Sequence, residues 1–155
     1  MWQTGKIGII VLGCCFAVPS LATDAFSQES DCAWQAREYA IESPLCGLVG
    51  DPGRGRALAA DRHAGNCLAC HQMPIPEEAF HGTLGPPLDG VGARYSAAQI
   101  RLRIVDEQQI NPMTVMPGFY RDPKLANRVA DPYWGKTFLT AQQVEDLVAY
   151  LMSLK

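Results

Sequence analysis

Two cysteines and a histidine stand close together in the run Cys67-Leu68-Ala69-Cys70-His71. The pattern C-x-x-C-H is the attachment signature of a c-type haem, in which both thiols bond the porphyrin and the imidazole binds the iron. We therefore predict one haem c held through Cys67 and Cys70, with His71 as proximal ligand. The alternatives are a zinc half-site and a redox dithiol. A zinc site needs a second ligand pair, which no C-x-x-C or H-x-x-x-H elsewhere in the sequence supplies, and a dithiol does not need the histidine.

The first residues have the architecture of a signal peptide. One cation, Lys6, precedes an apolar stretch over residues 7–19 that is interrupted only by small residues and two cysteines. This stretch is too short to cross a bilayer as a helix, and Ser20-Leu21-Ala22 offers small residues where a signal peptidase cuts. We expect residues 1–22 to be a signal peptide, so that the mature chain begins near Thr23 in the periplasm.

A second interpretation of this region is lipid attachment. The run Val11-Leu12-Gly13-Cys14 has the form of a lipobox, which would leave a lipid anchor on Cys14, although the apolar segment before it is unusually short. No later segment is long and apolar enough to span a membrane. The processed protein is expected to be soluble and exported.

The charge of the chain is mildly acidic, with 13 Lys+Arg against 16 Asp+Glu. The basic residues are scattered rather than clustered, which argues against a nucleic-acid partner. Without the signal peptide the chain has the size of one domain.

Two further cysteines of the mature chain, Cys32 and Cys46, are left over by the haem motif. In an oxidising compartment they most simply form a disulfide, closing a loop of about 15 residues and contributing on the order of 3 kcal/mol. The alternative is two separate thiols. The disulfide would leave no nucleophilic thiol in the mature chain.

The chain divides into an N-terminal extension over residues 23–50 and a haem domain over residues 51–155. Stretches rich in Pro and Gly follow the haem motif and favour loops over regular structure. A porphyrin offers a large apolar surface on which such loops can pack, so few helices are needed. The predicted fold is all-α, with few helices and long loops wrapped around one covalently attached haem.

Helix signals occur at four places. Residues 31–41 have little clear period but suit a short helix. Asp51 and Pro52 begin a firmer helix that is expected to reach Ala64, with glycines at 53 and 55 that permit close approach of another helix.

Two more helices are predicted further along the chain. Ser96 caps a helix that runs to Asp106. Thr140 and Gln143 form a capping box before the terminal helix, whose apolar stripe is expected to pack on the helix from Asp51, with Tyr150 crossing near Gly53 or Gly55. That stripe consists of Val144, Leu147, Val148 and Leu151.

The second axial ligand is predicted to be a methionine. Met116 precedes Pro117, which favours an extended backbone and hence a loop that can cross the haem face. Met113 is the chemical alternative, and His63 or His81 would give bis-histidine ligation. Met73 and Met152 are more plausible as packing residues.

A ligating imidazole usually donates its other N–H to a fixed acceptor. The carbonyl of Pro86, in the rigid turn Gly85-Pro86-Pro87, suits that role. Turn formation alone is the other explanation of the prolines.

Three runs of this sequence resemble a known family. They are GNCLACH over residues 65–71, GPPLDGVGARY over residues 85–95 and NPMTVMP over residues 111–117. Together with the terminal helix they are similar to class I cytochromes c, and more narrowly to the SoxX family, the monohaem subunits of SoxAX complexes in bacterial thiosulfate oxidation. The resemblance implies that Met116 is the sixth ligand and that Pro86 accepts the N–H of His71.

The resemblance also implies a function. In that family the SoxA subunit carries the sulfur chemistry, an L-cysteine S-thiosulfotransferase activity that joins thiosulfate to a carrier protein's cysteine. The haem subunit, itself not catalytic, takes electrons from SoxA and passes them to a soluble cytochrome c.

Two other functions remain open from the residues. One is a free-standing periplasmic electron carrier. The other is a gas sensor or peroxidase-like protein, which requires that Met116 does not bind the iron. A permanent partner would need an apolar patch, for which the candidate residues are Trp34, Trp134, Tyr133 and Phe138.

Overall fold

The computed structural model describes Met1 and residues 32–125, 129–131 and 134–155. Residues 2–22 of the predicted signal peptide, which include Cys14, and Tyr133 lie outside the described residues. The α-helices are α1 (Pro52–Ala60), α2 (Val91–Arg94), α3 (Ala97–Asp106) and α4 (Ala141–Ser153). Short 3-10 turns are η1 (Leu45–Gly47), η2 (Cys67–Ala69), η3 (Glu107–Gln109) and η4 (Pro123–Leu125).

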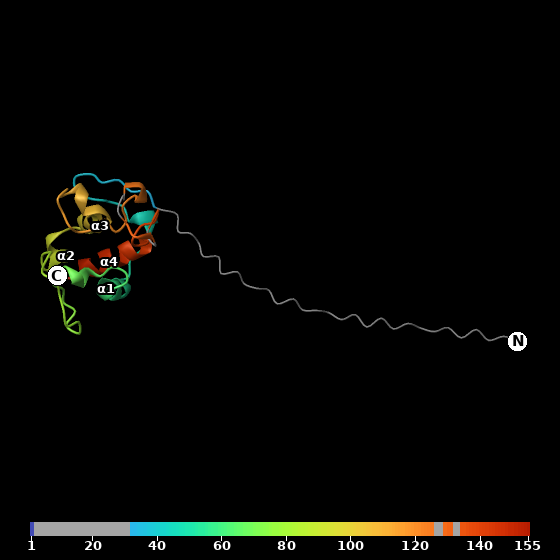
Figure 1. The fold of residues 1–155 in the computed structure, drawn as a ribbon, viewed down its shortest axis with the longest axis horizontal. Coiled ribbons are helices and arrows are strands. Elements are labelled where there is room, and N and C mark those ends of the chain that lie inside the picture. Colours follow the sequence, from blue (N-terminus) through green and yellow to red (C-terminus); the bar gives the residue numbers. More distant parts are fainter. Residues whose placement is uncertain (2–31, 126–128, 132–133) are drawn as a thin grey trace.

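The predicted all-α fold is confirmed. Helix α4 packs against α1, α2 and α3, and Figure 1 shows it between α1 and α3. The described part of the chain contains no strand, only an isolated bridge between Arg37 and Ala40. Long loops join the helices, as expected for a small domain built around a large apolar group.

The predicted helix starts are confirmed by their caps. The Asp51 carboxylate accepts from the Arg54 N–H at 2.7 Å, and Ser96 and Thr140 each form a complete capping box. Helix α1 ends at Ala60, four residues before the predicted end at Ala64. The chain instead folds back onto the helix, where a β-carbon on Gly65 would lie only 2.6 Å from the Leu58 carbonyl oxygen.

The predicted helix over residues 31–41 is wrong for the part that the structure describes. Arg37 and Ala40 exchange two backbone hydrogen bonds of 2.9 Å around a tight turn, in which Glu38 and Tyr39 have φ of 48° and 61°.

The predicted disulfide is confirmed, because Cys32 and Cys46 are bonded with their Cα atoms 5.5 Å apart. The loop closed by the disulfide and the contacts of Ile41 with α3, rather than local helix propensity, determine the backbone of residues 32–41.

A buried ion pair attaches the extension to the helices. Arg101 of α3 makes a bidentate contact with Glu145 of α4, with N–O distances of 2.7 and 2.9 Å, and both residues are buried. Arg101 also donates to the Ile41 carbonyl, and Glu145 accepts from the Leu45 N–H, each at 2.8 Å. Because both charges are paired and hydrogen-bonded, burial of the pair is tolerated, and the extension is held against α3 and α4.

Helices α1 and α4 cross at backbone contact. A β-carbon on Gly55 would lie 2.0 Å from the Asp146 carbonyl oxygen and 2.8 Å from the Tyr150 Cβ. The predicted crossing of Tyr150 is therefore confirmed at Gly55. The glycine in the first turn of α1 is required by this approach, not by an unusual φ.

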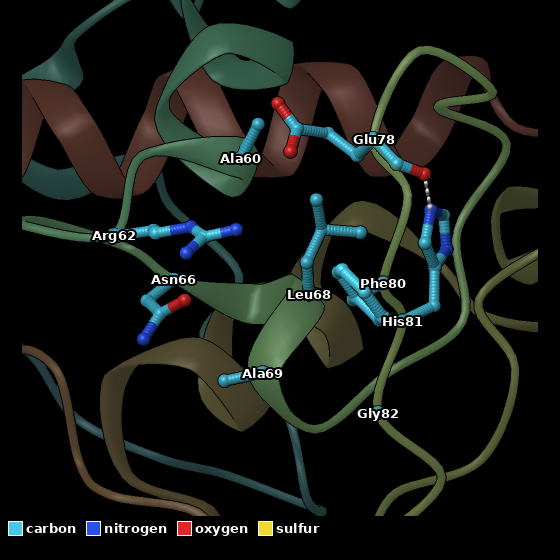
Figure 2. A pocket seen from close by; sticks show the side chains of 9 residues that line it. All are labelled: Ala60, Arg62, Asn66, Leu68, Ala69, Glu78, Phe80, His81 and Gly82. Atoms are coloured by element: carbon cyan, nitrogen blue, oxygen red, sulfur yellow. Dashed lines mark hydrogen bonds between the residues drawn. The ribbon is translucent and has the colours of Figure 1, made fainter.

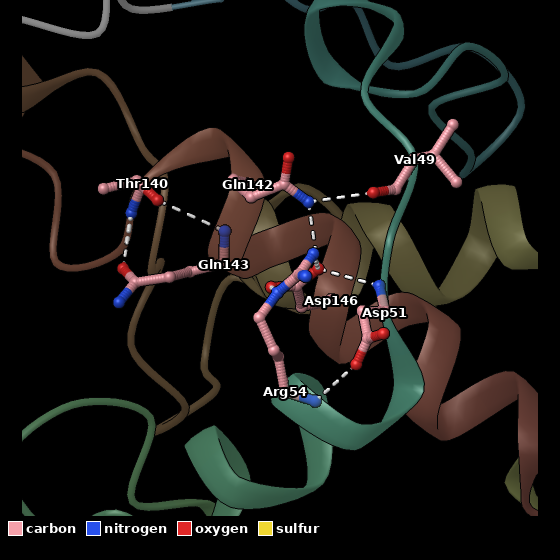
Figure 3. Close-up of polar contacts among 7 residues, drawn as sticks. All are labelled: Val49, Asp51, Arg54, Thr140, Gln142, Gln143 and Asp146. Atoms are coloured by element: carbon pink, nitrogen blue, oxygen red, sulfur yellow. Dashed lines mark hydrogen bonds and ion pairs between the residues drawn. The ribbon is translucent and has the colours of Figure 1, made fainter. Parts of the chain in front are cut away.

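The Asp146 carboxylate joins α1 to α4 at this crossing (Figure 3). Arg54 donates to both carboxylate oxygens at 2.7 and 2.8 Å, and the Asp51 N–H and the Gln142 amide donate to Oδ1. Burial alone would raise the pKa of Asp146, but the hydrogen bonds from Arg54, Asp51 and Gln142 outweigh burial and lower it. The charged form of this side chain therefore stabilises the folded protein.

We predict that Asp146→Asn lowers the free energy of unfolding by about 2 kcal/mol at neutral pH. The asparagine side chain has no charge, and its NH₂ group would face the N–H donors that now bond to the carboxylate. A carboxyl group whose folded-state pKa is lowered adds stability above its unfolded pKa of about 4 and loses it as pH falls. The difference between the two proteins should therefore shrink below about pH 4. Urea unfolding of the haem-loaded proteins across this range tests it, with the exposed Asp89→Asn as control. A difference that is independent of pH would contradict the prediction.

Candidate haem site

The C-x-x-C-H residues lie on a single tight turn. Asn66 adopts a left-handed backbone with φ of 48° and leads into η2. The Cys67 carbonyl then accepts from the N–H groups of Cys70, at 3.1 Å, and His71, at 2.9 Å. Both thiols are free of disulfides, so they remain available for attachment.

The chain after the motif folds back onto it. The Gly82 N–H donates to the Leu68 carbonyl at 2.7 Å, and the Gly85 N–H donates to the Cys70 carbonyl at 2.8 Å. A β-carbon on Gly82 would lie 2.0 Å from the Ala69 carbonyl oxygen. This fold-back places the Gly-Pro turn directly against the histidine.

The imidazole of His71 is held by that turn. Its Nδ1 lies 2.7 Å from the Pro86 carbonyl oxygen, which can only accept, so Nδ1 carries the hydrogen. The lone pair of Nε2 is then available to a metal. The predicted contact between His71 and Pro86 is present in the structure.

Gly85 is a site residue to which the sequence alone assigns no role beyond the turn. A β-carbon at this position would lie 2.3 Å from His71 Cε1 and 2.6 Å from Nδ1. Only a residue without a side chain allows the imidazole to lie this close to the turn. Its signal in the sequence was the dense Gly-Pro run, which cannot reveal what it packs against.

Cys67 lacks the lowered pKa of a reactive thiol. Burial raises the pKa of its thiol to about 11. Reactive C-x-x-C pairs contain a thiol whose pKa is lowered, because the thiolate is the nucleophile. A zinc site is also unsupported, since the described residues contain no group of three or more potential His, Cys, Asp or Glu ligands.

The loop after η3 presents the two candidate methionines differently. Met116 is half-buried, and its N–H donates to Thr114 Oγ1 at 3.1 Å. Met113 is 87% exposed. Met73 is buried in the core and Met152 packs at its edge, in agreement with their expected packing role. Of these two methionines, Met116 is the one that is partly shielded from solvent, as a ligand inside a haem pocket would be.

The two histidine alternatives are poorly suited to bind a metal. His81 uses both ring nitrogens, because Nδ1 accepts from the Met73 N–H at 3.1 Å and Nε2 donates to the Glu78 carbonyl (Figure 2). His63 is exposed on the turn after α1. Bis-histidine ligation is therefore disfavoured.

A pocket of about 480 Å³ lies beside the motif, between the end of α1, η2 and the loop that carries His81 (Figure 2). Its lining residues are Ala60, Arg62, Asn66, Leu68, Ala69, Glu78, Phe80, His81 and Gly82. The pocket is not lined by either thiol, by His71 or by Met116. The pocket is therefore separate from the donor groups of the site.

The donor set fits a c-type haem. Two free thiols stand on one turn with an imidazole whose tautomer is set by a carbonyl, and a thioether is carried by a separate loop. These are the groups that attach and ligate such a haem.

Comparison with known proteins agrees with this chemistry. The family model Cytochrome c matches residues 53–155. The chain belongs to the cytochrome c family. A solved chain described as "Crystal structure of SoxXA from P. pantotrophus" has 38% sequence identity and a TM-score of 0.72, over 79% of this chain and 94% of that chain. The cytochrome is therefore a SoxX-type class I cytochrome c, and the family implies covalently bound haem c. No curated protein matches.

Within the described residues, no helix of this cytochrome is both long and apolar enough to cross a membrane.

We predict that Gly85→Ala lowers the yield of haem-loaded cytochrome and its free energy of unfolding by about 2 kcal/mol, because the new methyl group displaces the His71 imidazole. Pro86→Ala is the matched control, since it keeps the carbonyl acceptor and should change stability by about 1 kcal/mol or less. Haem absorbance per protein and urea unfolding measure both effects. Equal behaviour of the two variants would contradict the assigned contact.

Proposed function

We propose that this cytochrome is the electron-transfer subunit of a SoxAX complex in thiosulfate oxidation. It would accept electrons from a catalytic SoxA-type partner and pass them to a soluble cytochrome c. The observation that carries the proposal is the match over 94% of a chain from a SoxXA crystal structure, together with the histidine held by Pro86. The sulfur chemistry, an L-cysteine S-thiosulfotransferase reaction, belongs to the partner in this proposal.

The residues of this chain have separate tasks at one haem c. Cys67 and Cys70 would tether it, and His71 Nε2 would bind its iron, with the ring orientation fixed by the Pro86 carbonyl. Met116 would supply a thioether to the iron, a ligand that raises the reduction potential. The bound haem supplies a one-electron change between ferrous and ferric iron.

This ligand set explains why the subunit itself would not be catalytic. An iron held by both His71 and Met116 would have no open position for a substrate. Cys32 and Cys46 are joined in a disulfide, so neither offers a nucleophilic thiol. Electron transfer is then the remaining chemistry of the site.

The proposed location is the periplasm, where C-x-x-C-H attachment and a stable disulfide are both compatible with the redox environment. Export would use residues 1–22 as a signal peptide. The mature protein would consist of an extension over residues 23–50 and a cytochrome c domain over residues 51–155.

The structure describes three of the four aromatic residues predicted for a partner surface, and two of these three are exposed. Trp134 is 67% and Phe138 is 39% exposed, whereas Trp34 packs against the core. Exposed aromatic side chains are common at stable interfaces. They are candidate contacts for the proposed partner.

We expect the oxidised haem-loaded protein to show the near-infrared charge-transfer band of a methionine bound to ferric iron. Met116→Ala should abolish the band because it removes the thioether. Met113→Ala, which truncates an exposed methionine three residues earlier, should keep it. A band that survives Met116→Ala would exclude this ligand, and a high-spin parent that binds carbon monoxide readily would favour the sensor or peroxidase-like alternative.

The partner is tested by co-expression with a SoxA-type subunit from the same source. We expect the two chains to co-elute in size-exclusion chromatography at micromolar concentration, as a stable interface requires. Elution of this cytochrome only as a monomer, with the methionine band intact, would favour a free-standing periplasmic carrier.

A further inference from the structure

The loop that carries Met116 returns to the end of α3. The N–H groups of Phe119 and Tyr120 donate to the carbonyls of Ile104 and Val105, at 3.1 and 3.2 Å. The Phe119 carbonyl in turn accepts from the Leu139 N–H, just before α4. The chain immediately after Met116 is therefore joined by backbone hydrogen bonds to the last turn of α3.

A buried carboxylate stands at this junction. Asp106, the last residue of α3, has no exposed surface. It accepts from the Gln109 amide at 3.1 Å and from the Gln108 N–H at 3.3 Å. A buried charge requires an opposite charge or several donors, and amide groups alone satisfy it only in part.

The opposite charge comes from the far side of the loop. Arg121 Nε lies 3.6 Å from Asp106 Oδ2, and Arg121 also donates to the side-chain oxygen of Gln108. Residues 106 and 121 thus close the base of the segment that contains Met116.

The backbone next to the ligand lies directly against the same carboxylate. A β-carbon on Gly118 would be 3.2 Å from Asp106 Oδ1, 3.2 Å from the Val105 carbonyl oxygen and 3.0 Å from the Arg121 Cβ. Because Gly118 is two residues from Met116, a shift of the carboxylate or the guanidinium would be transmitted to the ligand loop.

We propose that Asp106 and Arg121 are positioning residues for the sixth ligand. Their pair fixes both ends of the Met116 loop and so holds the thioether where it competes successfully for the iron. Closing a loop at its base reduces the entropy that ligation would otherwise cost. The inference rests on the proposed function, in which Met116 binds the iron.

A second ion pair on the same helix provides a control. Arg103 and Glu107 interact one helical turn apart, with an N–O distance of 2.7 Å. Both belong to the α3–η3 segment, so this pair does not span the Met116 loop. Glu107→Gln removes the same charge as Asp106→Asn, one residue away.

The test is competition by imidazole for the sixth position of the oxidised haem-loaded protein, read from the loss of the methionine charge-transfer band. The apparent affinity for imidazole depends on the fraction of molecules whose loop has released the iron. We expect Asp106→Asn and Arg121→Gln to bind imidazole about tenfold more tightly than the parent. Arg121→Lys should recover part of the difference because it restores the charge, and Glu107→Gln should match the parent.

The outcomes separate the inference from the function on which it rests. A parent that shows no methionine band, or that binds imidazole as tightly as Met116→Ala, would overturn the proposed ligation itself. A parent with the band, together with Asp106→Asn and Arg121→Gln variants of parental imidazole affinity, would overturn only the positioning role. Urea unfolding of each variant checks for general destabilisation. If Asp106→Asn does not fold, the imidazole affinity of Arg121→Gln alone tests the positioning role. Arg121 is partly exposed, so its substitution is better tolerated.

Discussion

Helix α4 holds the fold together through two neighbouring carboxylates that serve different parts of the chain. Glu145 is paired with Arg101 and accepts from the backbone of Leu45, so it secures α3 and the N-terminal extension. Asp146 accepts from Arg54 and the backbone of Asp51, so it secures α1. Breaking either contact would leave a buried charge without its partner, which is far more costly than losing an exposed ion pair.

The candidate haem site depends on the packing of both α1 and α3 against α4. Helix α1 leads into the turn that carries Cys67 and Cys70, so its packing on α4 determines where the thiols stand. Helix α3 supplies the carbonyls of Ile104 and Val105 to which the chain after Met116 is bonded. The C-x-x-C-H turn and the Met116 loop are therefore both attached to helices that pack on α4. A loop-rich chain can hold residues that are far apart in the sequence in fixed places because its few helices are fixed to one another.

Local signals were read well from the sequence where a short run of residues decides the outcome. The caps at Asp51, Ser96 and Thr140 are confirmed, because capping involves residues only three positions apart. The disulfide followed from a count of cysteines, and the structure confirms it. The helix predicted over residues 31–41 is absent from residues 32–41, where the disulfide and the contact of Ile41 with α3 accompany an irregular path with a tight turn at Glu38 and Tyr39.

The sequence by itself determined the chemistry of this protein, since C-x-x-C-H places two thiols and an imidazole on one turn whatever surrounds them. It also indicated the Gly-Pro turn and the Met-Pro loop as the remaining parts of the site. Only the tertiary structure decided that Gly85 must lack a side chain beside His71, and that Asp106 and Arg121 meet at the base of the Met116 loop. The physical reason is distance along the chain. Contacts between residues fourteen or fifteen positions apart depend on how the helices pack, and no local pattern encodes that packing.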